Sequence, residues 1–178
     1  MKLPSHYKTR TSVLFSRDIS PQPSPPSPEA IKVAVALIYQ RIEGDRFRFL
    51  ATLRAHDVPR GNLWEFPGGK ADQGETMLQA ARREVQEELD IELMHVHGSP
   101  FCIVGDDDPS QSREQVIELH AFAFDATSLQ LEPTALAARE VRWIEGHAFH
   151  DFDWPNANTA IFDAFAAWFQ ATTDQPPS

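Results

Sequence analysis

The chain has 178 residues, of which 42% are hydrophobic and 24% charged, and its formal net charge is −10. This composition predicts one globular domain. The acidic balance argues against a broad basic surface for nucleic acid polymers or anionic membranes. A single cysteine, Cys102, excludes an intramolecular disulfide and favours a cytoplasmic location, and no stretch approaches the roughly 18 apolar residues that span a membrane.

Residues 1–29 differ in composition from the rest of the chain, because prolines alternate there with Ser and Gln. Such a sequence favours extended conformations and does not form a packed helix. We interpret residues 1–29 as a flexible proline-rich extension, with a short strand at 12–15 or a docking motif as alternatives. Residues 30–172 are the predicted domain, and 173–178 a flexible tail.

From residue 31 the pattern becomes that of β-strands. Apolar or alternating runs predict strands at 31–39 and 47–53, joined by a hairpin turn at 43–45. A loop at 56–62 leads to a short strand at 64–66. Further strands are expected at 93–104, 115–124 and 141–144, with a polar turn at 106–114. Residues 159–170 predict a helix with one apolar face.

A second helix is predicted after the Pro67-Gly68-Gly69 turn. Thr76 followed by Gln79 matches a capping box at its start. Four residues fall on one side at helical spacing and predict its buried face: Leu78, Ala81, Val85 and Leu89.

Glu84, Glu87 and Glu88 lie together on one flank of this helix, since positions three and four apart are neighbours. Like charges so placed repel, and carboxylate oxygens are the ligands that Mg²⁺ and Mn²⁺ prefer. Arg83 precedes Glu87 by one turn and can orient its carboxylate. A Glu-rich run alone is typical of a solvated helix face, but the glycine turn and the ordered spacing favour a divalent-metal site.

Residues 69–91, the signature segment, resemble the signature of Nudix hydrolases, Gly-x5-Glu-x7-Arg-Glu-U-x-Glu-Glu-x-Gly-U with U aliphatic. Every specified position matches except Asp90, which stands where the family has its last Gly. That Gly follows the helix, where a left-handed conformation is common, and Asp tolerates this conformation better than most residues. Residues 63–70 (LWEFPGGK) and 155–158 (PNAN) are similar to MutT-type members, which hydrolyse 8-oxo-dGTP.

The resemblance implies an α/β fold, a Nudix-type α/β/α sandwich with a mixed β-sheet. It also implies metal-dependent hydrolysis of (d)NTP to (d)NMP and pyrophosphate, with oxidised purine nucleotides such as 8-oxo-dGTP as expected substrates. The metal, Mg²⁺ or Mn²⁺, would be held by the Gly68 carbonyl, Glu84, Glu87 and Glu88. Arg83 joins the three glutamates as a catalytic position, and Glu84 or an outside carboxylate, with Glu140 the best candidate, would be the general base.

The resemblance implies six substrate-binding positions: Arg54, Glu65, Phe66, Gly69, Lys70 and Asn158. Arg54 and Lys70 would contact phosphates, with a local salt bridge as an equal alternative for Lys70. The residues that match Phe66 and Asn158 line the purine pocket of MutT-type enzymes. An amide offers both a donor and an acceptor to the edge of an oxidised guanine. The competing interpretations are a helix N-cap for Asn158 and a plain core position for Phe66.

Two other functions stay open. The first is a Nudix enzyme with another substrate, such as a pyrimidine triphosphate, a nucleotide sugar or ADP-ribose. The second is a non-catalytic nucleotide sensor, which we would expect to lose signature carboxylates that this chain keeps. We expect a monomer or a homodimer.

Other motifs are weaker. His95 and His97 would face one way on a strand and could bind zinc, but no third ligand is apparent. The three aspartates at 106–108 lack the spacing of a calcium loop. Cys102 lies in an apolar run and is predicted to be a buried small hydrophobe rather than a nucleophile. His147 and His150 are expected at the surface or in loops.

Overall fold

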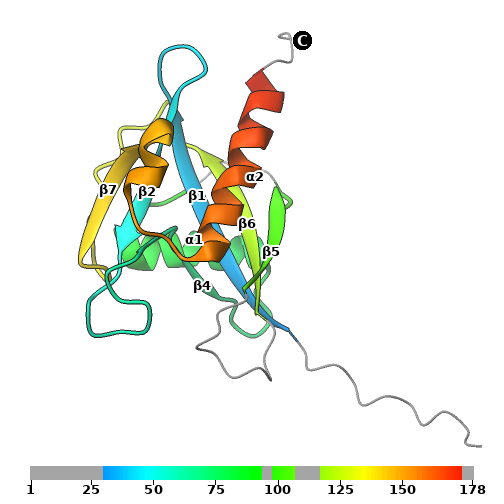
Figure 1. The fold of residues 1–178 in the computed structure, drawn as a ribbon. Helices are drawn as coiled ribbons and strands as arrows, with labels where there is room; N and C mark the ends of the chain where they lie inside the picture. Colours follow the sequence, from blue (N-terminus) through cyan, green and yellow to red (C-terminus); the bar gives the residue numbers. More distant parts are fainter. Residues whose placement is uncertain (1–29, 94–97, 107–116, 174–178) are drawn as a thin grey trace, which may run out of the picture.

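The computed structural model describes residues 30–93, 98–106 and 117–173 (Figure 1). Within them, seven strands form one sheet: β1 (Ile31–Arg41), β2 (Phe47–Leu53), β3 (Trp64–Glu65), β4 (Gly68–Lys70), β5 (Cys102–Asp106), β6 (Ile117–Asp125) and β7 (Glu140–Glu145). The helices are α1 (Met77–Leu89), α2 (Asn156–Thr173) and the short 3₁₀ helix η1 (Gly146–Asp151).

The sheet is mixed, as predicted, and β1 lies at its centre. The strand order is β3-β2-β1-β6-β5, with β1 parallel to β6 and antiparallel to β2. The short strand β4 pairs antiparallel with the first half of β1, and β7 pairs antiparallel with β2.

The two long helices cover opposite faces of the sheet, with α2 in front of it and α1 behind it (Figure 1). Successive residues of β1 alternate between these layers: Val35, Leu37 and Tyr39 belong to the α2 core, and Ala34, Ala36 and Ile38 to the α1 core. Because both faces are covered, β1 is a continuous apolar run rather than an alternating one. The predicted α/β/α sandwich is confirmed.

Local signals set both ends of α1. Gln79 donates its backbone N–H to Thr76 Oγ1 at 3.2 Å, and Thr76 donates its own to Gln79 Oε1 at 2.9 Å, so the predicted capping box is confirmed. Asp90 ends the helix in the left-handed conformation (φ 56°, ψ 37°), as expected for the position where the signature has Gly. Three of the four predicted face residues, Ala81, Val85 and Leu89, are buried, together with Ala80.

Two predictions about strands were wrong. The strand expected over 93–104 begins only at Cys102 and runs to Asp106, since Gly98 and Pro100 just before it do not favour pairing. The glycines expected to form only a turn instead form β4, where Gly68 and Gly69 pair with Val35 and Ala34 of β1. Helix α2 is also longer at both ends than expected, and it includes Thr173.

Several sequence predictions lie outside the described residues. They concern the extension at 1–29, the histidines His95 and His97, the aspartates Asp107 and Asp108, and the tail at 174–178. In the part of the chain that the structure does describe, no helix combines the length and the hydropathy needed to cross a bilayer.

Candidate active site

The two glycines of β4 let this strand lie close to β1 on one side and to a carboxylate of α1 on the other. A Cβ atom on Gly68 would overlap the backbone of Ala34 in β1, and one on Gly69 would overlap the carboxylate of Glu84. The Glu84 side chain therefore lies directly against the backbone of Gly69. The sequence Gly-Gly serves this close approach, which only residues without a side chain allow.

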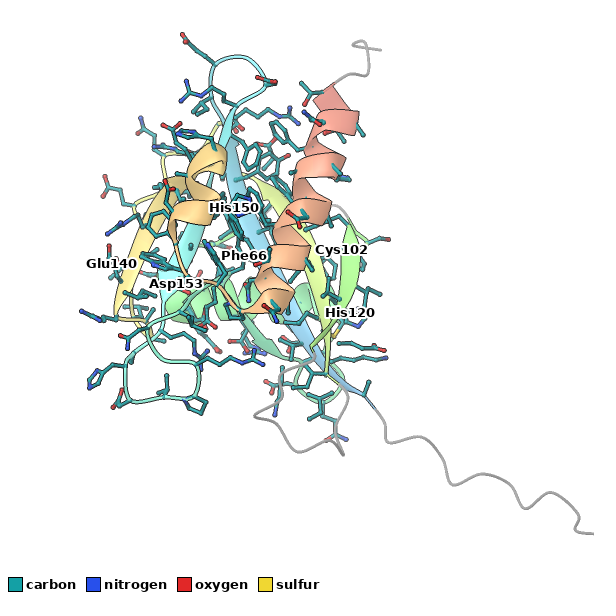
Figure 2. The ribbon with its side chains drawn as sticks, in the orientation of Figure 1. Phe66, Cys102, His120, Glu140, His150 and Asp153 are labelled. Atoms are coloured by element: carbon teal, nitrogen blue, oxygen red, sulfur yellow. The ribbon has the colours of Figure 1, made fainter. Side chains whose placement is uncertain are left out.

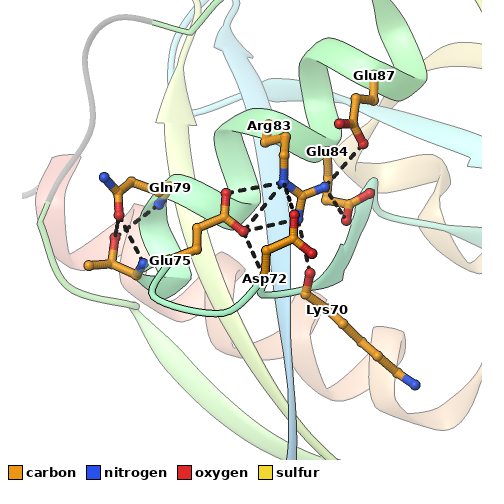
Figure 3. Close-up of polar contacts among 8 residues, drawn as sticks. Lys70, Asp72, Glu75, Gln79, Arg83, Glu84 and Glu87 are labelled. Atoms are coloured by element: carbon orange, nitrogen blue, oxygen red, sulfur yellow. Dashed lines mark hydrogen bonds and ion pairs between the residues drawn. The ribbon is translucent and has the colours of Figure 1, made fainter.

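Arg83 joins the loop after β4 to two carboxylates of α1 (Figure 3). Its Nη1 donates to Glu84 Oε1 at 2.9 Å and to Glu87 Oε2 at 3.0 Å. Its Nε donates to Glu75 Oε1 at 3.1 Å, and its Nη2 to the carbonyl of Lys70 at 3.0 Å. These bonds, that to Glu75 above all, raise the pKa of Arg83. The predicted pairing with Glu87 is confirmed, and the same guanidinium also fixes Glu84.

Glu88 is the carboxylate of α1 with the most perturbed acidity. Burial, followed by the charges of Glu65 and Glu84, raises its pKa from 4.5 to about 7, and a hydrogen bond from the Gly68 backbone opposes the change. Glu65, Glu84 and Glu88 therefore form a carboxylate cluster in which the first two disfavour the ionised form of partly buried Glu88.

Arg54 and Glu65 form a pair beside this cluster. Arg54 Nη1 donates to both carboxylate oxygens of Glu65, at 2.9 and 2.8 Å. Burial raises the pKa of Glu65, while Arg54 acts in the opposite direction. The pair joins the end of β2 to β3 and sets the direction in which the Arg54 guanidinium points.

The donors around the cluster suit a hard divalent cation in their chemistry. Among the described residues, no three His, Cys, Asp or Glu side chains converge on one metal position. Arg83 instead pairs with Glu84 and Glu87, and Arg54 pairs with Glu65. The donors are all oxygens, which Mg²⁺ and Mn²⁺ prefer. The raised pKa of Glu88 also reports a repulsion that a bound cation would relieve. The residues present therefore fit such a metal.

A cavity of about 310 Å³ opens beside β4. We call it the β4 cavity. All six residues expected to bind substrate line it, together with Gly68: Arg54, Glu65, Phe66, Gly69, Lys70 and Asn158. The fold thus brings residues as distant in sequence as Arg54 and Asn158 to the same cavity.

Six further residues line the β4 cavity and were not predicted: Val33, Val35, Pro59, Arg60, Ile117 and Leu119. The apolar ones belong to the paired starts of β1 and β6, where Val33 stands beside Leu119. Their sequence patterns indicate only strands, so no local signal marks them. Pro59 and Arg60 belong to the loop before β3, and no motif in the sequence marks them as cavity residues.

Asn158 and Phe66 meet at the floor of the cavity. Asn158 Oδ1 accepts a hydrogen bond from the backbone N–H of Phe66 at 3.1 Å. Asn158 is the third residue of α2 and is buried, so the N-cap interpretation is wrong. The Phe66 ring stacks on Trp154 with a centroid distance of 5.5 Å, and Figure 2 shows it between the sheet and α2. Phe66 is therefore both a core residue and part of the cavity wall.

The structure also places several other predicted residues. Glu140, at the start of β7, lies at the outer side of the sheet (Figure 2) and pairs with Arg142, so the structure does not bring it to the cavity.

The Lys70 side chain points away from the Arg83 group (Figure 3) and forms no ion pair with a described residue. Cys102 is only partly buried, and this burial raises its pKa to about 11, which disfavours a nucleophilic thiolate as predicted. His147 and His150 are exposed on η1, as expected.

Comparisons with known proteins agree with this geometry. Residues 30–168 match the family model described as the NUDIX domain. The chain is 40% identical over 65 residues to the 8-oxo-dGTP diphosphatase of Escherichia coli K12, a match that covers 36% of this chain and spans 47%, about half, of that relative's length. It is 34% identical over 112 residues to putative 8-oxo-dGTP diphosphatase 2 of Mycobacterium tuberculosis, which covers 61% of this chain and 72% of that protein.

Among solved structures, the chain resembles the E. coli ORF135 protein with a TM-score of 0.63 and 26% identity, over 82% of this chain and 95% of that one. The family match thus spans nearly the whole described region, and it includes β4, α1 and the carboxylates that lie against the two glycines. The chain belongs to the NUDIX domain family.

Proposed function

We propose that the protein is a divalent-metal-dependent nucleotide pyrophosphohydrolase. It converts a nucleoside triphosphate to the monophosphate and pyrophosphate, and it prefers oxidised purine nucleotides such as 8-oxo-dGTP. The β4 cavity carries this proposal, because it gathers all six expected substrate contacts at the glycine strand on which the Glu84 carboxylate rests.

The metal would be held by the Gly68 carbonyl, Glu84, Glu87 and Glu88. When bound, Mg²⁺ or Mn²⁺ supplies a water of lowered pKa and neutralises the charge of the phosphate oxygens. Arg83 is a positioning residue in this proposal, since it holds Glu84 and Glu87 at 2.9 and 3.0 Å from one guanidinium nitrogen.

Arg54 and Lys70 provide positive charge on the cavity wall where the phosphate chain would lie. Arg54 is oriented by its two hydrogen bonds to Glu65, so part of its fork is already fixed before substrate arrives. Such preorganisation lowers the entropy cost of binding an anion. The Glu65 carboxylate is thus assigned to positioning Arg54 rather than to contact with phosphate.

The base would lie against Phe66 and Asn158. Asn158 Oδ1 already accepts the Phe66 N–H, so the amide nitrogen is the group that remains to donate to a base. An acceptor on the purine edge, such as a guanine carbonyl, fits this donor. The aromatic ring supplies contact area without distinguishing among bases.

A nucleotide panel tests the proposal. Wild-type protein with Mg²⁺ and, separately, Mn²⁺ is incubated with 8-oxo-dGTP, dGTP, CTP, ADP-ribose and a nucleotide sugar, and the products are identified. We expect monophosphate and pyrophosphate, with the highest kcat/KM on 8-oxo-dGTP. Faster turnover of CTP or ADP-ribose would replace the substrate class, and tight nucleotide binding without turnover would indicate a sensor.

The domain boundaries at 30–172, the cytoplasmic location and the monomeric or homodimeric state belong to the same proposal. The family match supports the domain start, because it begins at residue 30.

A further inference from the structure

The described lining of the β4 cavity carries an excess of positive charge. Three cationic side chains, Arg54, Arg60 and Lys70, and one carboxylate, Glu65, line it. This excess stands out in a chain whose formal net charge is −10. A concave wall of one sign concentrates the field and attracts ligands of the opposite sign. Arg60 is the cation that no sequence motif accounts for.

The backbone of Arg60 is in the left-handed region, with φ at 61°. This conformation is uncommon for residues other than Gly and is strained for a long side chain. Asn62, two positions later, has φ at 64°, but Asn is among the residues enriched in this region. Strain at Arg60 therefore calls for a reason that Asn62 does not require.

The surrounding loop holds Arg60 in this conformation. Arg54 Nε donates to the carbonyl of Pro59 at 3.0 Å, and Gly61 donates its N–H to the carbonyl of Val58 at 2.9 Å. A Cβ atom on Gly61 would stand only 2.6 Å from a backbone carbonyl oxygen on the other side of the loop, so the chain passes too closely for another residue. Backbone contacts on both sides of Arg60 thus fix its position at the cavity wall.

We propose that Arg60 is a further substrate-binding residue, which contacts the phosphate chain of the nucleotide. The proposal rests on the proposed function and adds a residue to it. A guanidinium matches phosphate oxygens through paired N–H donors. The loop fixes the backbone that carries this group at the cavity wall.

The charge of Arg60 acts on the side of the cavity where the carboxylate cluster lies. Burial raises the pKa of Glu65, and the charges of Arg54 and then Arg60 oppose that rise. Arg60 thus follows Pro59, whose carbonyl the Arg54 guanidinium binds, on the side of the cavity assigned to phosphates, while Phe66 and Asn158 form the side assigned to the base.

The test compares Arg60→Gly with Asn62→Gly. Both changes relieve a left-handed backbone on the same loop, but only the first removes a cavity-lining cation. Arg60→Lys keeps the charge and serves as the conservative variant. Melting temperature, KM and kcat for 8-oxo-dGTP and dGTP, and the inhibition constants of inorganic pyrophosphate and of the uncharged nucleoside are measured for each full-length protein.

We expect Arg60→Gly to remain folded, because Gly adopts the left-handed backbone of this position without strain. Its KM for triphosphates should rise about ten- to a hundredfold, as for the loss of a charge-assisted hydrogen bond, with kcat changed far less. Inhibition by pyrophosphate should weaken in parallel, and inhibition by the nucleoside should not change. Arg60→Lys should recover part of the affinity, and Asn62→Gly should keep wild-type KM.

A wild-type KM in a stable Arg60→Gly protein would overturn the proposal, as would a loss confined to the nucleoside. An equal rise in KM in Asn62→Gly would also overturn it, because loop conformation rather than the cation would then be responsible. Failure of the wild type to hydrolyse any triphosphate would instead reject the proposed function, and pyrophosphate binding measured by calorimetry would still report on Arg60.

Discussion

Asn158 Oδ1 accepts a hydrogen bond from the backbone N–H of Phe66 at 3.1 Å, although the two residues are 92 positions apart in sequence. The bond joins α2 to the segment between β3 and β4, directly at the cavity wall. The Asn158 oxygen therefore fixes the backbone that leads into the signature segment, and in the proposed function its amide nitrogen donates to the base.

Replacing Asn158 should affect stability and base preference together. Asn158→Ala leaves the buried Phe66 N–H without its acceptor, which should lower the free energy of unfolding by about 1–3 kcal/mol. It also removes the amide donor, so the preference for 8-oxo-dGTP over dGTP should largely disappear. Chemical denaturation and the ratio of the two kcat/KM values measure these effects.

Asn158→Asp is the matched control, since it keeps an acceptor for the Phe66 N–H and removes only the donor. It should retain more stability than Asn158→Ala while losing the same base preference. An unchanged substrate ratio in both variants would assign Asn158 to structure alone.

Gly69→Ala should disable the site without unfolding the protein. The added methyl group would overlap the Glu84 carboxylate, which is the flexible end of a side chain and can move away. We expect a melting temperature within a few degrees of wild type and turnover reduced by about a hundredfold or more, as for misplaced catalytic groups. Gly105→Ala is the control, because a Cβ at that position meets no atom within 4 Å. Equal turnover in the two variants would contradict the placement of Glu84.

Arg83 should control how tightly the protein binds its metal. Arg83→Ala frees Glu84 and Glu87 from the guanidinium that holds them, so these carboxylates must be ordered when the cation binds. We expect the Mg²⁺ concentration for half-maximal activity to rise about tenfold or more, with partial rescue at high Mg²⁺. Arg82→Ala, the neighbour on the same helix, should behave as wild type. Identical Mg²⁺ curves for the two variants would refute a positioning role.

The raised pKa of Glu88 predicts a pH dependence of stability in metal-free protein. Because the folded state shifts this pKa from 4.5 to about 7, it binds the proton more tightly than the unfolded state does. The stabilisation is complete below about pH 4.5 and is lost as the pH rises through 7. With chelator present, the free energy of unfolding of Glu88→Gln at pH 8 should therefore be higher than that of wild type by on the order of 2 kcal/mol. The difference should disappear toward pH 4.5. A difference that stays constant with pH would show that Glu88 does not titrate in this way.

Local patterns in the sequence predicted those elements whose signals lie within a few residues. The capping box at Thr76 and the left-handed Asp90 define α1 without help from the rest of the chain. Strand β4 escaped prediction because nothing in Gly68 and Gly69 favours a strand; they pair only because β1 offers Ala34 and Val35 as partners. Pairing between distant segments has no local signature.

The presence or absence of a local sequence signal also separates the predicted residues of the candidate site from the unpredicted ones. Motif resemblance located Phe66, Lys70 and Asn158, and the structure brings them to one cavity. Arg60 is conspicuous only through its φ and its place on the cavity wall, which are tertiary properties. Glu140 was plausible in sequence as an outside base, but in the structure it pairs with Arg142 and is not among the residues that line the cavity.

The central claim is that the carboxylates of α1 support metal-dependent hydrolysis, and turnover of glutamine variants tests it most directly. Release of pyrophosphate from 8-oxo-dGTP with Mg²⁺ is measured for Glu84→Gln, Glu87→Gln and Glu88→Gln, with exposed Glu92→Gln as the control. We predict that the three variants stay folded and that those that remove a metal ligand lose about a hundredfold or more in kcat, as metal-site ligands do, while Glu92→Gln retains wild-type turnover. Wild-type turnover in Glu87→Gln and Glu88→Gln would contradict the claim.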